Sequence, residues 1–341
     1  MENREGIIEF VKEAYPITKG KYRIPLAVTE FFIEKEKLKE IEEKLNAIFL
    51  RIKEIVFEFL DNSLKGYPID EFRKNLYLKI YENYNYKFKG IIRFDMINFK
   101  LIEINADAVE GVIQLDITSK WFSELFDFVG EPRYNREPFL SLFDKPAIIV
   151  YPDNYLFVDE YYLESKLLKG PYIKESEFYE NKKYRIYPIY RRAIDIDKVK
   201  KLDYWLEKQN INDILFTIMG NKANLAFLDK EVDWALDIVA KTSFKPEFKK
   251  YVCKPYFGTH GEVYFEKRDN CVYQEFIEIP KREISYLDID DKIKKGIFYY
   301  DFNPYAFFDK KLRFGNILLR FSKDHILNVA KGGGVGFYTI V

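Results

Sequence analysis

Residues 91–107 read IIRFDMINFKLIEINAD and carry the clearest secondary-structure pattern considered in the chain. Apolar and polar residues alternate with a period of two on either side of a short break, which is typical of strands rather than helices. The pattern predicts two strands, 91–95 and 100–105, joined by a three-residue turn at 97–99. The two strands should pair as a hairpin with one apolar and one polar face.

Four polar side chains should meet on the polar face of this hairpin. Alternate residues of a strand share a face, so Arg93 and Asp95 point the same way, and Glu103 and Asn105 join them if the turn has three residues. Two carboxylates and an amide oxygen suit Mg²⁺, which prefers oxygen ligands and keeps several waters. The alternative is an ordinary amphipathic hairpin whose polar face meets solvent.

A second candidate site is the segment KPYFGTHG, which starts at Lys254 and contains Gly258 and Gly261. Glycines let backbone N–H groups approach phosphate oxygens, and a lysine adds a point charge. The segment is therefore a candidate phosphate-binding loop, with a plain hairpin loop as the alternative. It is not a Walker P-loop, because no GxxxxGK[ST] run occurs in the chain.

Two further residues have chemistry that suits a nucleotide. Gln274 and Glu275 interrupt an apolar strand expected at 272–276, and their side chains could hydrogen-bond an adenine edge and a ribose; exposed positions on an edge strand are the alternative. Lys222 begins a stretch expected to be helical, where a lysine usually lies on the solvated surface.

Two other motifs give weaker signals. Arg191 and Arg192 suit an acidic ligand, but neighbours in a strand face opposite sides, so at most one should line a given site. The run GGGVG at 332–336 is similar to part of a dinucleotide fingerprint, yet no helix can follow it to bind the phosphates. A nicotinamide-binding function is therefore disfavoured, and a close backbone approach or a flexible loop is expected there.

Composition narrows the class of protein. Of 341 residues, 48% are hydrophobic and 18% aromatic, which predicts a folded chain with a sizeable core. Lys and Arg number 55 against 55 Asp and Glu, so a general nucleic-acid binder, which is usually basic, is disfavoured. Two cysteines and two histidines supply neither a disulfide framework nor a ready zinc site. A charged start without a signal peptide, and no long apolar run, predict a cytoplasmic protein with no membrane partner.

The remaining pattern predicts an α+β fold with a helical N-terminal region and mixed or antiparallel sheets. Three regions are expected: a helical region with the hairpin, at 1–140 (hairpin at about 87–107); a central α/β region on the substrate side, at 141–221; and a strand-rich region with the glycine loop, at 222–341. The expected helices include 34–60, 70–81, 118–129, 198–209 and 230–241, and the expected strands include 184–194, 262–266 and 326–330.

Taken together, these segments resemble the glutathionylspermidine synthetase-like family, a permuted branch of the ATP-grasp ligases. The similarity rests on five short motifs in the family's order. They are Arg-Phe-Asp at 93–95, Glu-Ile-Asn-Ala-Asp at 103–107, Gly-Asn-Lys-Ala at 220–223, Val-Cys-Lys-Pro at 252–255 with Gly258 and Gly261, and Tyr-Gln-Glu at 273–275. They span the last three quarters of the chain.

The resemblance implies an ATP-grasp fold around a nucleotide cleft, and an ATP-dependent ligase that joins a carboxylate to an amine through an acyl phosphate. It implies ATP and Mg²⁺ as cofactors, and a small-molecule or peptide carboxylate and an amine acceptor as substrates. The implied roles are Mg²⁺ binding by Asp95, Glu103 and Asn105, stabilisation of the transferring phosphoryl group by Arg93, phosphate binding by Lys222, Lys254, Gly258 and Gly261, and adenine or ribose binding by Gln274 and Glu275.

The chain also departs from the family pattern. The glycine loop reads Gly-Thr-His-Gly, where the family often has an Arg-Glu pair before the last glycine, so Thr259 removes a possible charge. Glu275 stands at the second amide position, and the length leaves no room for an amidase domain. A non-catalytic nucleotide-binding or scaffold protein that keeps the fold is the alternative, as is a ligase that modifies a protein or murein-like acceptor.

Overall fold

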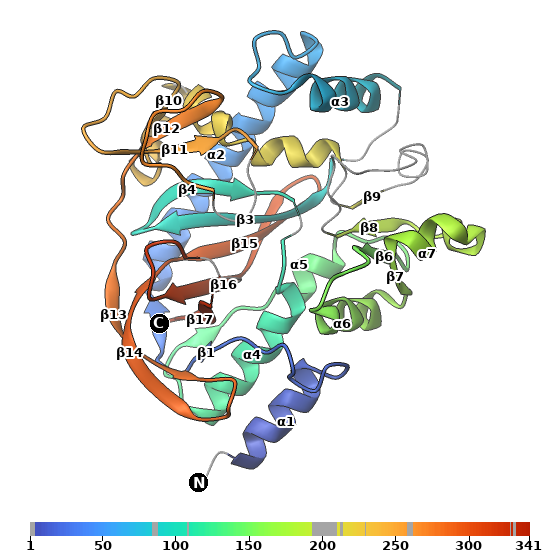
Figure 1. Cartoon of the computed structure of the whole chain (residues 1–341), viewed down its shortest axis with the longest axis vertical. Coiled ribbons are helices and arrows are strands. Elements are labelled where there is room, and N and C mark those ends of the chain that lie inside the picture. The colour runs from blue at the N-terminus through green and yellow to red at the C-terminus, as the bar shows by residue number, and fades with distance from the viewer. Residues whose placement is uncertain are drawn as a thin grey trace.

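A computed structural model of the chain describes residues 4–83, 88–107, 109–192, 210–211, 214–228, 230–257, 262–327, 329 and 332–341. The described part is α+β, as expected, with one ten-stranded mixed sheet and two smaller sheets of three and four strands (Figure 1). None of its helices combines the length and the apolar character that crossing a membrane requires.

The helices lie mainly in the first half of the chain. The α-helices are α1 (Arg4–Ala14), α2 (Lys35–Asp61), α3 (Glu71–Asn83), α4 (Val112–Leu125), α5 (Arg136–Leu140), α6 (Val158–Leu168) and α7 (Glu175–Glu180). The 3-10 helices are η1 (Lys182–Ile186), η3 (Leu215–Gly220), η4 (Lys222–Phe227) and η5 (Lys230–Ile238).

The large sheet draws strands from both ends of the chain. They are β1 (Leu26–Ala27), β2 (Phe31–Ile33), β3 (Gly90–Ile97), β4 (Lys100–Asn105), β5 (Glu131–Pro132), β13 (Lys281–Leu287), β14 (Ile293–Tyr300), β15 (Asn303–Phe308), β16 (Leu312–Ser322) and β17 (Gly334–Ile340). Their order is β2-β17-β1-β13-β14-β16-β15-β3-β4, with β5 also on β17. Because β16 pairs with β17 as well, the strands β17, β1, β13, β14 and β16 form a closed ring.

The hairpin β3–β4 reaches its expected register by an unexpected route. Its turn has two residues, Asn98 and Phe99, both with positive φ, which is the geometry of a type I′ turn. A two-residue turn alone would put the polar residues of the two strands on opposite faces. A bulge restores the register, so that Arg93 faces Asn105 across the ladder. The expected three-residue turn is therefore wrong, but the expected convergence is confirmed.

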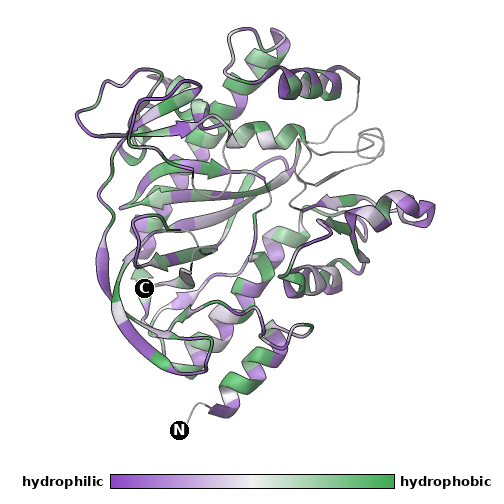
Figure 2. Cartoon of the chain, in the orientation of Figure 1, coloured by the Kyte–Doolittle hydropathy of each residue, from purple (hydrophilic) through white to green (hydrophobic). Residues whose placement is uncertain are grey.

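Helix α2 covers the apolar face of this part of the sheet. Its buried residues recur at steps of three and four, and they pack with the hairpin in one core. The rings of Phe49 and Phe94 lie 6.5 Å apart at their centroids, and those of Phe49 and Phe308 lie 4.9 Å apart. Figure 2 shows both hydropathy colours on α1 and α4, as amphipathic helices require. The polar residues that flank Phe94 therefore point to the face opposite α2.

Two smaller sheets flank the large one (Figure 1). The first is antiparallel, with the order β10-β12-β11, and the second is parallel, with the order β7-β6-β8-β9. Their strands are β10 (Thr242–Ser243), β11 (Tyr251–Pro255), β12 (Cys271–Glu275), β6 (Ile148–Tyr151), β7 (Tyr172–Lys174), β8 (Ile189–Arg191) and β9 (Asn210–Ile211). The segment before β10 joins the hairpin, because the N–H of Ala240 donates to the carbonyl of Leu101 at 3.0 Å.

Several expected elements differ in the structure. The expected strand 184–194 is divided between η1 and the short strand β8, and the expected strand 262–266 is reduced to one isolated bridge at Tyr264. The described residues of 326–330 hold no strand, and α4 begins at Val112 rather than at 118. The expected helix 230–241 is the 3-10 helix η5, and the expected helix 198–209 lies outside the described residues.

The glycine-rich end makes a close backbone approach. Gly334 and Gly336 lie within β17, and a Cβ at Gly334 would meet the carbonyl oxygen of Pro25 at 2.6 Å. A Cβ at Gly336 would meet that of Ala27 at 2.8 Å. Both glycines therefore let β17 pass close to the N-terminal strand, which confirms the first of the two expectations for this run.

Candidate active site

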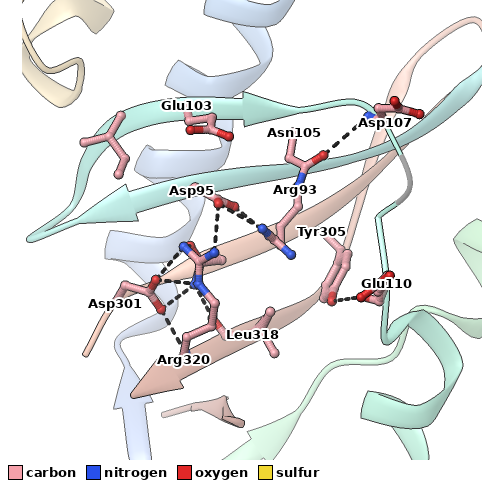
Figure 3. Close-up of polar contacts among 12 residues, drawn as sticks. Arg93, Asp95, Glu103, Asn105, Asp107, Glu110, Asp301, Tyr305, Leu318 and Arg320 are labelled. Carbon is pink, nitrogen blue, oxygen red and sulfur yellow. Dashed lines mark hydrogen bonds and ion pairs between the residues drawn. The ribbon is translucent and has the colours of Figure 1, made fainter. Parts of the chain in front are cut away.

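A network of ions lies on the polar face of the large sheet (Figure 3). Arg93 donates to both oxygens of Asp95, through Nε at 2.6 Å and Nη2 at 2.9 Å. A second guanidinium, that of Arg320 on β16, lies 3.1 Å from Asp95 Oδ2. Asp95 is only 4% exposed, so its charge is neutralised by arginines rather than by water.

The residues of this network that lie outside the hairpin belong to no motif recognised in the sequence. Arg320 donates to Asp301 at 2.7 Å, and Asn303 on β15 accepts from Arg320 at 3.3 Å. Asp301 and Asn303 are also joined by a hydrogen bond of 2.5 Å. These three residues follow the hairpin by about two hundred positions and form no recognisable motif, so only the strand order β16-β15-β3 brings them to Asp95.

The arginines determine the protonation of Asp95. Burial alone raises the pKa of Asp95, but Arg320 and Arg93 more than offset it and lower the pKa to about 2. Burial also lowers the pKa of Arg93, and Asp95 more than reverses that effect. Both groups therefore carry their charges at neutral pH.

Two lysines reach the hairpin from other segments. Lys222, at the start of η4, lies 3.6 Å from the carboxylate of Glu103. Lys254 on β11 donates to the carbonyl of Ile102 at 3.0 Å and is 4% exposed. Burial lowers the pKa of Lys254 to about 8, with Lys222 adding to the effect and Glu103 opposing it. Both lysines thus lie next to the hairpin, and Lys222 is 7% exposed, so the solvated position usual for a lysine at a helix start does not apply to it.

The bulge in β4 explains how β11 and β12 are held against the hairpin. Ile102 is the extra residue, between the partners of Asp95 and Met96. Its carbonyl oxygen accepts from both Lys254 and Gln274, the latter at 3.1 Å. Gln274 also donates to the hydroxyl of Thr242 at 3.0 Å. The amide expected to face adenine therefore bonds to protein groups in this structure.

Of the other residues expected to bind the nucleotide, Glu275 lies within the described part of the chain and the glycines of the loop 258–261 do not. Glu275 is at the end of β12, where its carboxylate accepts the backbone N–H of Lys241 at 2.9 Å. Gly258 and Gly261, with Thr259 and His260 between them, lie outside the described residues. Their role in phosphate binding stays a prediction.

The donors on the hairpin fit magnesium in type. Asp95 and Glu103 are register partners, and Asn105 follows on the same face. Asp95 Oδ1 accepts one hydrogen bond and keeps a second lone pair, whereas Oδ2 faces two guanidinium groups. Asn105 Oδ1 accepts the N–H of Asp107 at 3.3 Å. Magnesium usually takes one or two carboxylates and keeps waters and substrate phosphates, which matches so sparse a set.

The described residues contain no denser cluster of metal-binding side chains than the set on the hairpin. Within the described residues, no group of three or more His, Cys, Asp or Glu side chains is gathered so as to hold a metal ion. The hairpin set has two carboxylates and an amide, so a metal bound there would need ligands from a substrate or from water. This set is the one that the sequence indicated.

The segment after β4 borders the polar face. Tyr305, the register partner of Arg93, donates to the carbonyl of Glu110 at 2.6 Å (Figure 3). Arg191 donates to Asp107 at 2.7 Å, and Arg192 donates to the carbonyl of Val109. The two arginines thus contact different residues, and the expectation that at most one of them lines a given site stays a prediction.

Comparison with known proteins does not assign the chain to a family. No family model matches it, and no curated protein matches it.

Proposed function

We propose that the chain is an ATP-dependent carboxylate–amine ligase of ATP-grasp type, similar to the glutathionylspermidine synthetase-like family. One observation carries the proposal. The hairpin residues Arg93, Asp95 and Glu103 meet two lysines that come from segments more than one hundred residues later. Carboxylates that can hold Mg²⁺, together with lysines and an arginine that can bind phosphate oxygens, are the groups that phosphoryl transfer from a nucleotide requires.

Each group has a role in the proposed reaction. A carboxylate oxygen of the substrate attacks the terminal phosphorus of ATP, ADP leaves, and the amine nitrogen then displaces phosphate from the acyl carbon. Arg93 neutralises charge on the transferring phosphoryl group, and Lys222 and Lys254 bind phosphate oxygens. Asp95, Glu103 and Asn105 would hold Mg²⁺, which would neutralise charge on the phosphates when bound. Gln274 and Glu275 stand on the adenine side, and no histidine or thiolate is needed.

The state of the two cysteines supports a proposal about the location of the protein. Both cysteines, Cys253 and Cys271, are free thiols buried in the small sheet. Free thiols accord with a reducing compartment, so we propose that the ligase acts in the cytoplasm, where ATP is available. Its substrates would be a small-molecule or peptide carboxylate and an amine, not nucleic acid.

The decisive experiment is an ADP-release screen with Mg-ATP. The carboxylates and amines offered are amino acids, glutathione, short peptides and polyamines, and mass spectrometry identifies the amide. We expect ADP release that needs both a carboxylate and an amine. Asp95→Asn combined with Glu103→Gln should reduce turnover at least a hundredfold while circular dichroism stays unchanged.

A matched control makes this test specific. Asp290→Asn combined with Glu283→Gln changes the same two residue types at exposed positions of the hairpin β13–β14, Asp290 in its turn and Glu283 in β13. The control should keep full turnover. Equal turnover in the two double variants would refute the role given to Asp95 and Glu103.

A non-catalytic nucleotide-binding or scaffold protein is the second candidate, and one observation favours it. Both oxygens of Asp95 are engaged by Arg93 and Arg320, as in a purely structural ion network. If calorimetry shows ATP binding while no substrate pair releases ADP, this candidate replaces the ligase.

A further inference from the structure

The segment that joins β4 to α4 is held by side chains from three separate elements. Each of three consecutive residues gives one backbone group to a buried side chain. The contacts are Val109 O with Arg192 Nη1, Glu110 O with the Tyr305 hydroxyl at 2.6 Å, and Gly111 N–H with Glu160 Oε1 at 2.8 Å. We call residues 109–111 the linker loop. Such complete fixation is unusual for a connecting segment, which normally stays mobile.

Two of these side chains belong to a buried ion cluster behind the linker loop. Arg192 is 0% exposed and pairs with Glu160 on α6, and the carboxylate of Glu164, one turn later, lies 3.7 Å from its Nε. The rings of Tyr161 and Tyr190 flank the guanidinium. Two carboxylates therefore share one guanidinium without access to water.

This cluster is poorly arranged for stability. Neither oxygen of Glu164 has a hydrogen-bond partner among the described residues, nor has Nε of Arg192. Buried ion pairs contribute little to stability when their desolvation is not fully repaid, although they can specify one conformation. Glu160 and Arg192 bond to the linker loop and to each other, and Arg192 also donates to the Tyr190 hydroxyl at 3.1 Å. The geometry of the loop is thus what this cluster specifies.

The linker loop is directly connected to the candidate active site. Asn105 ends β4 and accepts the N–H of Asp107, and the loop begins two residues after Asp107, past residue 108, which lies outside the described residues. At its other side, Tyr305 is the register partner of Arg93. A displacement of the loop would therefore move Asn105 and release Tyr305 from its position beside Arg93.

We propose that Glu160 and Arg192 are positioning residues that fix the linker loop and, through it, Asn105 and Tyr305. Neither touches the reacting atoms; both act through the backbone of residues 109–111. The catalytic meaning of this proposal rests on the proposed ligase function, but the structural part does not.

Amide hydrogen exchange of the full chain without nucleotide tests the structural part. Glu160→Ala removes the acceptor of the Gly111 N–H and leaves Arg192 with Glu164 as its counter-charge, so the fold should survive. We expect exchange in peptides covering the linker loop to rise at least tenfold, while peptides of α2 keep their rates. Glu160→Gln keeps an acceptor oxygen and should restore most of the protection.

Glu164→Gln is the matched control, because it changes the same residue type on the same helix beside the same arginine, without a bond to the loop. It should leave exchange in the loop unchanged. Wild-type exchange in the loop of Glu160→Ala would overturn the proposal, and so would an equal rise in Glu164→Gln.

Turnover tests the catalytic part separately. In the ADP-release assay, Glu160→Ala should lower kcat at least tenfold, with Glu160→Gln within about threefold of the wild type and Glu164→Gln unchanged. If wild-type protein releases no ADP, the ligase proposal fails while the exchange result still decides on positioning. Exchange that rises without any loss of kcat would overturn the proposal that positioning of the loop by Glu160 supports turnover.

Discussion

The polar face of the large sheet and the cluster behind the linker loop both bury arginines with carboxylates, but they balance charge differently. On the sheet, Asp95 and Asp301 face Arg93 and Arg320, so two anions meet two cations. Behind the loop, Glu160 and Glu164 share Arg192. The first network satisfies its carboxylates with hydrogen bonds, and the second leaves one carboxylate without any among the described residues.

The net pKa shifts of Asp95 and Glu164 are opposite, although burial raises the pKa of both carboxylates. The arginines lower the pKa of Asp95 to about 2 despite its burial. Burial raises the pKa of Glu164 to about 7, with Arg192 opposing the rise and Glu110 adding to it. Asp95 therefore adds stability above the pKa of a free aspartate, whereas burial raises the pKa of Asp301, and Glu164 costs stability as the pH rises from about 4.5 to 7.

The largest effect should come from breaking the balanced network. Arg320→Ala leaves Asp301 buried without its counter-charge and removes one of the two cations at Asp95. Removing one partner of a buried pair typically costs about 3–5 kcal/mol. Urea unfolding at pH 7 should show a loss of this size. Arg313→Ala, on the exposed part of the same strand, should change stability by less than about 0.5 kcal/mol; equal losses in both variants would contradict the assignment.

A smaller effect, of opposite sign, should come from relieving the unbalanced cluster. The pKa of Glu164 is higher in the folded than in the unfolded chain, so its ionisation costs stability as the pH rises from about 4.5 to 7. Glu164→Gln removes that cost and should be more stable than the wild type by about 1–3 kcal/mol at pH 8, with little difference at pH 4.5.

The pH dependence is the check on this second prediction. Unfolding free energies of both proteins are compared at pH 4.5, 6 and 8, with Glu110, Glu160, Arg192 and the flanking tyrosines left unchanged. A difference that stays constant over this range would show that Glu164 keeps its ordinary pKa in the folded chain.

The smallest effect is expected on the affinity for nucleotide, when Lys254 beside the balanced network is replaced. Lys254→Ala removes a buried ammonium group that lies beside Glu103 and donates to Ile102. We expect affinity for Mg-ATP to fall about tenfold, as measured by calorimetry, which corresponds to about 1.4 kcal/mol. Lys249→Ala, exposed before the same strand, should bind normally. Native affinity in Lys254→Ala would remove this lysine from the nucleotide site.

The sequence predicted the hairpin well because its alternation is strict and one face must be apolar. It could not predict the bulge at Ile102, since two opposite changes, a shorter turn and an extra residue, leave the same polar face. Nor could it predict Arg320 and Asp301, which reach Asp95 only through the order of distant strands. The strands β13 and β14 were missed because their exposed lysines and glutamate obscure the alternation.

The linker-loop cluster was missed for a different reason. Arg191 and Arg192 were recognised as a pair, but their partners lie on α6 and in the segment after β4, and only tertiary packing brings these together. The alternation of faces does not extend to Arg192, because β8 ends at Arg191. Local patterns thus predicted the elements that carry charge, and long-range pairing decided which charges meet.

The closed ring of strands has a consequence for the order in which the chain folds. Strand β17 lies between β16 and two N-terminal strands, and the hydrogen bond from Thr339 to Glu30 spans 309 residues. At ordinary rates of synthesis, roughly 15–60 seconds separate the emergence of these two residues from the ribosome. The edges of β1 and β2 that β17 later occupies stay unpaired for that time, so a nascent chain is most exposed to aggregation and to chaperones just before β17 is made.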